Sequence, residues 1–201
     1  MARKPAGPSA DEQAEFTITG LQARPVVVPM RLPLHTASGA LTKAALVLID
    51  VRTNHGVTGR SYLFAIGAHN LKPIVGLVDA MGEMIAGEPV APFDIERLLR
   101  KQYALLGVHN IVLFAISGID MALWDAYAQS LEQPLVNVLG GTVQPIKAYN
   151  SKGLGIMPVG KLGKEANKLV KEGFSAVKLR LGRAEAKDDL EAVRTVKKAI
   201  G

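Results

Sequence analysis

The sequence contains no cysteine, and only 5% of its 201 residues are aromatic. Without thiols the protein has no disulfides, no thiolate metal site and no cysteine nucleophile, so its chemistry uses oxygen and nitrogen groups. Long hydrophobic runs are missing as well, because the longest, Ala44–Ile49, is far short of the roughly 20 residues of a membrane span. Residues 1–15 lack the apolar core of a signal peptide. These absences favour a soluble, cytoplasmic protein.

Hydrophobic residues are plentiful, and the charged residues are unevenly distributed along the chain. Hydrophobic residues make up 48% of the chain and charged residues 21%, which is typical of a packed globular protein. Residues 1–142 hold 11 Lys and Arg against 12 Asp and Glu, whereas residues 143–201 hold 13 against 6. The basic residues of the second part lie in amphipathic patterns without interleaved aromatics. We interpret them as solvated helix faces and expect neither nucleic acid nor a membrane as a partner.

The hydrophobic pattern divides the chain into three parts. Residues 1–15 have no periodicity, and we expect a flexible leader there. Residues 16–142 start with strand patterns and continue with helical spacing, which predicts an α+β domain containing an antiparallel sheet. Residues 143–201 alternate between strand and helix patterns, which predicts β/α units with a parallel sheet.

Within residues 16–142, the strand patterns are separated by a stretch rich in proline and glycine at 29–40, where we expect a loop. The expected strands are 16–28, 46–53 and 57–64. The expected helices are 71–85, 94–103 and 110–130. The last of these is apolar on nearly every side, so it belongs in a buried position.

Residues 143–201 read as the first two β/α units of an incomplete barrel. The expected strands are Ile146–Ser151 and Ala176–Leu181, and the expected helices are 161–172 and 186–200. Two parallel strands leave open edges and an open face, so they do not form a stable domain alone. A larger barrel of the TIM type is therefore expected to include them.

A pair of cations is the first candidate for chemistry. Side chains alternate along Ala176–Leu181, so Lys178 and Arg180 share one face of the strand, opposite its apolar residues. In a barrel this face points inward. Arginine does not readily lose its proton, so Lys178 is the candidate general base or carboxylate-binding group of the pair. The alternative to a chemical role is that the two cations simply lie on the solvent-exposed face of an alternating strand.

Two further segments carry candidate substrate contacts. Asn150 and Ser151 end the first parallel strand, at the rim where active sites of such barrels lie. The stretch from Leu34 through Thr36 to Gly39 belongs to the long expected loop, which is a candidate lid over a site. Ordinary strand termination and ordinary loop exposure are the structural alternatives for these residues.

Taken together, these features resemble the mandelate racemase subgroup of the enolase superfamily, which includes the muconate lactonizing enzymes. The resemblance extends in order over nearly all of residues 16–201. The matching stretches are His35-Thr36-Ala37, Leu46–Asp50, Ser61–Ala65, Gly118–Ala122 with Trp124-Asp125, Pro134-Leu135 leading to Leu139-Gly140, and Gly173-Phe174 leading to Ala176–Lys178. The family pairs an α+β capping domain with a (β/α) barrel, so the resemblance implies the capping domain at 16–142 and a truncated barrel domain at 143–201.

The resemblance implies removal of the proton α to a carboxylate, with Mg stabilising the resulting enediolate. By this analogy Lys178 and Arg180 take the catalytic positions, and Lys178 contacts the substrate carboxylate. Ser151 contacts the same carboxylate, with Asn150 and Thr36 as further substrate contacts. Leu34 and Leu41 fall at apolar lid positions that exclude water. A small carboxylate substrate and a homo-oligomeric enzyme follow from the same analogy.

Two departures qualify this implication. The family usually carries a second lysine where this chain has Arg180, which makes an acid-sugar dehydratase with a single opposing base the alternative to racemisation. The family's metal ligands lie on the next three barrel strands, so we expect them beyond Gly201 and expect this chain to be inactive alone. The alternative hypothesis outside the enzymes is a non-catalytic interaction module that binds polyanions through its basic half, residues 143–201.

Overall fold

The computed structural model describes residues 15–37 and 39–201, and the leader expected at 1–15 lies outside them except for Glu15. The elements are β1 (Ile18–Thr36), β2 (Gly39–Thr53), β3 (Thr58–Phe64), a 3-10 turn (Ala68–Asn70), α1 (Leu71–Ile85), α2 (Pro92–Gln102), α3 (Asn110–Ser130), α4 (Leu135–Val138), α5 (Val159–Val170) and α6 (Ala186–Ile200). They form two compact units. The first comprises the described chain up to Val26 together with Ala45–Val143, and the second comprises Val27–Ala44 together with Gln144–Gly201.

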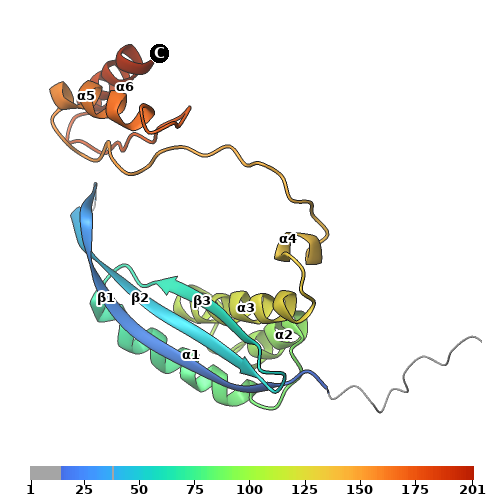
Figure 1. Cartoon of the computed structure of the whole chain (residues 1–201). Helices are drawn as coiled ribbons and strands as arrows, with labels where there is room; N and C mark the ends of the chain where they lie inside the picture. Colours follow the sequence, from blue (N-terminus) through green and yellow to red (C-terminus); the bar gives the residue numbers. More distant parts are fainter. Residues whose placement is uncertain (1–14, 38) are drawn as a thin grey trace, which may run out of the picture. The chain divides into compact units, whose positions relative to one another are not determined.

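The first unit is a three-stranded antiparallel sheet backed by helices, which confirms the predicted α+β capping domain. The strand order is β1-β2-β3, and β2 pairs with β3 in a register that places Val47 opposite Leu63 and Asp50 opposite Arg60. From Ala45 onward the odd-numbered residues of β2 are buried and the even-numbered ones are not, as expected for a sheet with one covered face. Figure 1 shows α1 and α3 side by side along that covered face.

The strands β1 and β2 are longer than the sequence pattern indicated, so the loop predicted at 29–40 is wrong. Strand β1 continues to Thr36 and β2 begins at Gly39. Proline normally signals a break, but an edge strand tolerates it where the missing N–H would face away from the neighbouring strand. Pro29, Pro33 and His35 lie at even spacing on the edge strand β1, so their backbone groups face one side. The His35 carbonyl faces outward there, because it accepts a hydrogen bond from the Ile156 N–H at 3.4 Å.

Helix α3 is the central helix of the first unit, and its predicted bounds and burial are confirmed. It packs against β3, α1 and α2. Gly59 on β3 makes the close approach possible, because a Cβ there would stand 1.9 Å from the Ala122 carbonyl oxygen. The Ser61 hydroxyl, which donates to the Gly118 carbonyl at 2.6 Å, fastens β3 to the helix. By length and hydropathy α3 would also pass for a membrane span, but 50% of that stretch is buried inside the protein, as in a core helix.

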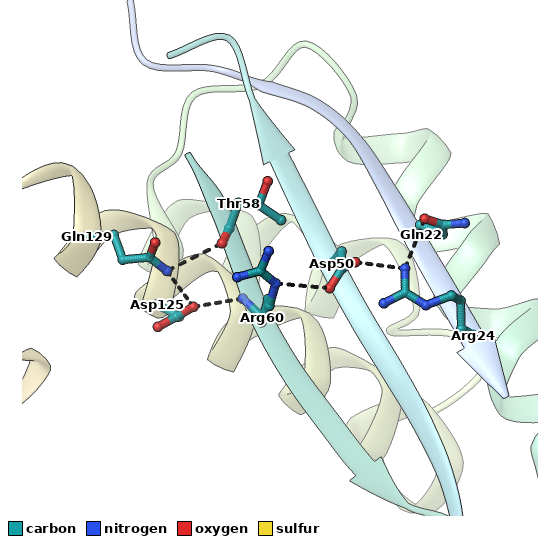
Figure 2. Close-up of polar contacts among 7 residues, drawn as sticks. All are labelled: Gln22, Arg24, Asp50, Thr58, Arg60, Asp125 and Gln129. Carbon is teal, nitrogen blue, oxygen red and sulfur yellow. Dashed lines mark hydrogen bonds and ion pairs between the residues drawn. The ribbon is translucent and has the colours of Figure 1, made fainter. Parts of the chain in front are cut away.

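A chain of polar contacts crosses the outer side of the sheet (Figure 2). The Asp50 carboxylate lies 2.8 Å from the Arg24 guanidinium on β1 and 3.8 Å from that of Arg60 on β3. The Arg60 backbone N–H donates to Asp125 on α3 at 2.8 Å, and the Gln129 amide donates to the same carboxylate at 2.7 Å. The contacts connect all three strands to α3, so Asp125 has a structural role.

The second unit contains the two predicted β/α units in an abbreviated form. Helix α6 has its predicted bounds, and α5 lies two residues earlier than expected. The strands expected at 146–151 and 176–181 do not form regular strands, and one parallel bridge between Asn150 and Val177 represents them. Parallel pairing is weak without flanking strands, and no further strand flanks this pair among residues 39–201.

Helices α5 and α6 pack on each other around the second core. Leu154, Leu162 and Ala166 are completely buried there, and Leu169, Ala192 and Val196 complete the cluster. An ion pair fixes the entry to α6, because Arg183 lies 2.9 Å from Asp189 and its side chain is 9% exposed. The Gly182 N–H donates to the same carboxylate at 2.8 Å. This N–H and the Arg183 guanidinium hold the pKa of the Asp189 carboxyl below its ordinary value.

Replacing Gly59 by alanine is expected to destabilise the first unit. The new methyl group would collide with the α3 backbone, and overpacking of this kind costs about 1–3 kcal/mol or more. Gly76→Ala in α1 is the matched control, because nothing lies within 4 Å of its Cβ position and helical alanine gains about 0.5–1 kcal/mol over glycine. Urea unfolding followed by the fluorescence of Trp124 measures both. Equal stabilities of the two variants would contradict the close approach.

Replacing Asp189 by asparagine is expected to destabilise the second unit in a pH-dependent way. The folded pKa of Asp189 is lowered, so the stabilising contribution of the carboxylate is present above about pH 4 and disappears as the pH falls below that. The variant should therefore be less stable than the parent at pH 7, and the difference should shrink progressively as the pH is lowered below about 4. Urea unfolding followed by far-UV circular dichroism measures this, with Asp188→Asn as control and Trp124 fluorescence reporting the first unit separately. A stability difference that does not depend on pH would refute the role of the charge.

Candidate functional site

A small cavity in the second unit brings the tip of the β1–β2 hairpin against the segment that follows the first β/α strand. Its volume is about 130 Å³. The lining residues are Leu32, Pro33, Leu34, His35, Lys152, Gly153, Leu154, Gly155, Ile156, Met157, Glu165 and Arg180. Two predicted site residues, Leu34 and Arg180, thus line one cavity. The hairpin reaches the position expected of a lid, although it is built of strands.

Two glycines allow the hairpin tip to approach this closely. A Cβ on Gly155 would stand 3.2 Å from the His35 carbonyl oxygen, and one on Gly182 would stand 2.6 Å from the Ala37 Cβ. Gly182 also has a φ of +116°, which other residues rarely adopt. The hairpin tip therefore contacts the segments after both β/α strands.

The two candidate cations have different surroundings. The Lys178 ammonium lies over the Tyr149 ring, 5.9 Å from its centroid, and the lysine is exposed. The half-buried Arg180 side chain instead donates through Nη1 to the carbonyls of Ser151, at 3.4 Å, and Gly153, at 3.3 Å. Lys178 is available to an anionic ligand, whereas Arg180 is engaged with the backbone.

Asn150 supports the strand end in this structure, and its role as a substrate contact stays a prediction. Its side chain is buried, with 4% exposure. The amide nitrogen donates to the Leu169 carbonyl at 3.2 Å and to the Glu172 carboxylate at 3.1 Å, and the amide oxygen accepts from the Lys152 N–H at 3.1 Å. All the polar groups of Asn150 that would recognise a ligand therefore face the protein.

The remaining predicted contacts occupy three different settings. Ser151 is exposed beside Arg180, and the carbonyl of Ser151 is held by that residue. The Thr36 hydroxyl donates to the Gly39 carbonyl at 3.0 Å and so closes the hairpin turn. Leu41 is half-buried on β2 and is absent from the described residues that line the cavity. Of the proposed lid leucines, the structure places only Leu34 at the cavity.

Sequence reasoning missed two carboxylates that shape the site. Glu172 binds the Asn150 amide and, at 3.3 Å, the Lys152 ammonium; the Asn150 hydrogen bond and then the Lys152 one lower the pKa of Glu172. Asp189 holds the Gly182 turn. An acidic residue in the first turn of a helix, just after a glycine turn, was the available signal for Asp189. Nothing local identifies Glu172, because its partner Asn150 is distant in sequence.

The described residues do not by themselves hold a metal ion. Over 15–37 and 39–201, no three His, Asp or Glu side chains come together as a metal ion would require. The charged side chains that line the cavity are Lys152, Arg180 and the carboxylate of Glu165. Two cations beside one carboxylate give the lining an excess of positive charge, which favours an anionic ligand over Mg²⁺.

Solved enzyme structures resemble this chain over most of its length. A Bradyrhizobium enolase structure complexed with magnesium and mandelic acid is 38% identical, with a TM-score of 0.85, and the match covers 94% of this chain and 52% of that one. An enolase structure from the alphaproteobacterium bal199, with bound magnesium, is 37% identical with a TM-score of 0.87, covering 92% of this chain and 52% of that one.

Curated enzymes match as well, among them dehydratases, epimerases and cycloisomerases. The L-talarate/galactarate dehydratase of Salmonella typhimurium is 26% identical over 166 residues, which is 80% of this chain and 41% of that enzyme. The chain spans about half the length of such relatives, or less. Residues 18–140 match the N-terminal domain of mandelate racemase / muconate lactonizing enzyme. The chain therefore belongs to the mandelate racemase / muconate lactonizing enzyme family of the enolase superfamily.

Proposed function

We propose that this chain forms part of an enzyme that removes the proton α to a carboxylate, and that it racemises an α-hydroxy acid. The observation that carries the proposal is the exposed Lys178 ammonium, which belongs to the second β/α unit two residues before Arg180. Arg180 lines the cavity together with Leu34, whereas Lys178 is not among the described residues that line it. A cation at this place offsets the negative charge that develops on a carboxylate when its α-proton leaves.

Each residue contributes a distinct interaction in this proposal. Lys178 binds the substrate carboxylate through its ammonium, and the Ser151 hydroxyl donates to the same group. Leu34 covers the substrate with an apolar surface, which excludes water and strengthens the charge interactions beneath it. Magnesium, which the solved relatives contain, would take its ligands from outside the described residues.

A dehydratase of acid sugars is the second candidate, and a specific residue favours it. Arg180 stands where a second base would be needed for racemisation by two bases, and arginine keeps its proton. The Salmonella relative is a dehydratase, whereas the Bradyrhizobium relative is complexed with mandelic acid. We rank racemisation first because the Leu34 cover is apolar and suits an aromatic ring better than a polyhydroxylated chain. A homo-oligomeric, cytoplasmic enzyme acting on a small carboxylate completes the proposal.

The reaction is tested in a protein that contains this chain together with metal-binding strands, incubated in D₂O with one enantiomer of mandelate. We expect deuterium at the α-carbon and loss of optical rotation, and a rate about 100-fold or more lower for Lys178→Ala. Lys187→Ala, on the exposed surface of α6, is the matched control and should keep the parent rate. Formation of a 2-keto acid from galactarate instead would select the dehydratase. Unchanged exchange in Lys178→Ala would refute the assigned role of Lys178.

A further inference from the structure

The segment 151–157 joins the first β/α strand to α5 without regular secondary structure, and residue 180 binds it three times. The Arg180 guanidinium donates to the Ser151 and Gly153 carbonyls, and the Arg180 backbone N–H donates to the Leu154 carbonyl at 2.9 Å. Backbone carbonyls outside helices and sheets need such partners when they are shielded from water. One residue therefore binds three backbone carbonyls of this segment.

The same segment is the surface that meets the hairpin tip. Its Ile156 N–H donates to the His35 carbonyl, and Gly155 lies directly against His35. A second arginine holds the far end, because Arg183 Nη2 donates to the Met157 carbonyl at 3.1 Å while Nη1 pairs with Asp189. The segment is thus fixed between two arginines, with the hairpin tip resting on it.

The chemistry of the guanidinium fits this task and does not fit proton transfer. A guanidinium has five N–H donors in a planar fork and no lone pair, so it can bridge neighbouring carbonyls but cannot accept a proton. Among residues 15–37 and 39–201, no carboxylate forms an ion pair with Arg180, and its guanidinium donates to the Ser151 and Gly153 carbonyls. Its charge is therefore directed at the backbone.

We propose that Arg180 is a positioning residue, which fixes segment 151–157 as the floor of the cavity and sets Ser151, while Lys178 alone of the two cations acts on the substrate. The role of Arg180 in fixing segment 151–157 is supported by its hydrogen bonds to that segment. The role of Lys178 toward the substrate rests on the proposed function. An ammonium at position 180 would retain the charge but could not reproduce the planar fork.

Hydrogen–deuterium exchange of the whole chain tests the role of Arg180 in fixing segment 151–157. For Arg180→Met we expect the amides of 151–157 to exchange about tenfold faster than in the parent, because bonds from a charged donor are lost. Arg180→Lys should give an intermediate rate. Arg194→Met, an exposed arginine on α6, is the matched control and should leave the segment unchanged. Unaltered α5 and α6 protection shows that each variant is folded, and an unchanged 151–157 rate in folded Arg180→Met overturns the proposal.

Exchange of the substrate α-proton from each enantiomer separates positioning from proton transfer. A positioning role predicts that Arg180→Met slows exchange from both enantiomers to a similar degree, leaves the shape of the pH–rate profile unchanged, and is partly rescued by Arg180→Lys. Loss of exchange from one enantiomer alone would make Arg180 a base and overturn the proposal. If the parent enzyme exchanges no α-proton, the proposed function fails, and the amide exchange of 151–157 still decides the positioning role.

Discussion

The architecture of the site depends on the hydrogen-bonding demand of a backbone segment that belongs to no helix or sheet. Segment 151–157 contains the fully buried Leu154, so the carbonyls shielded there need partners that regular structure does not supply. Arg180, Arg183 and the hairpin residue His35 provide those partners. Residues 152–157 line the cavity together with the hairpin tip, and Arg180 also holds the Ser151 carbonyl, so the cavity and the setting of Ser151 both depend on this arrangement.

The need of these carbonyls for hydrogen-bond donors also explains why two neighbouring cations, Lys178 and Arg180, have different surroundings. Arg180 is half-buried and its guanidinium binds carbonyls, whereas the Lys178 ammonium is exposed and lies over the ring of Tyr149. An exposed ammonium is suited to a carboxylate ligand. In the proposed enzyme one cation contacts the substrate and the other holds the backbone of the site, which would account for an arginine in place of a second lysine.

The sequence predicts helices well where the apolar spacing is regular over many turns. It predicts an element or a contact poorly where neighbouring strands or residues distant in sequence determine the conformation. The helices at 110–130 and 186–200 have their predicted bounds, because their spacing is regular over many turns. The loop predicted at 29–40 is strand, because proline on an edge strand costs no ladder bond. For the site, Leu34, Lys178 and Arg180 could be named from their residue types. The burial of Asn150 could not, because it depends on Leu169 and Glu172, which are distant in sequence.

A crystal structure of the enzyme with an α-hydroxy carboxylate bound is the most direct test of the division of labour between Lys178 and Arg180. We expect a carboxylate oxygen within about 2.7–3.2 Å of the Lys178 ammonium and of the Ser151 hydroxyl, with the Arg180 guanidinium still on the Ser151 and Gly153 carbonyls. A carboxylate paired with Arg180 instead, with Lys178 turned away and segment 151–157 released, would contradict the account.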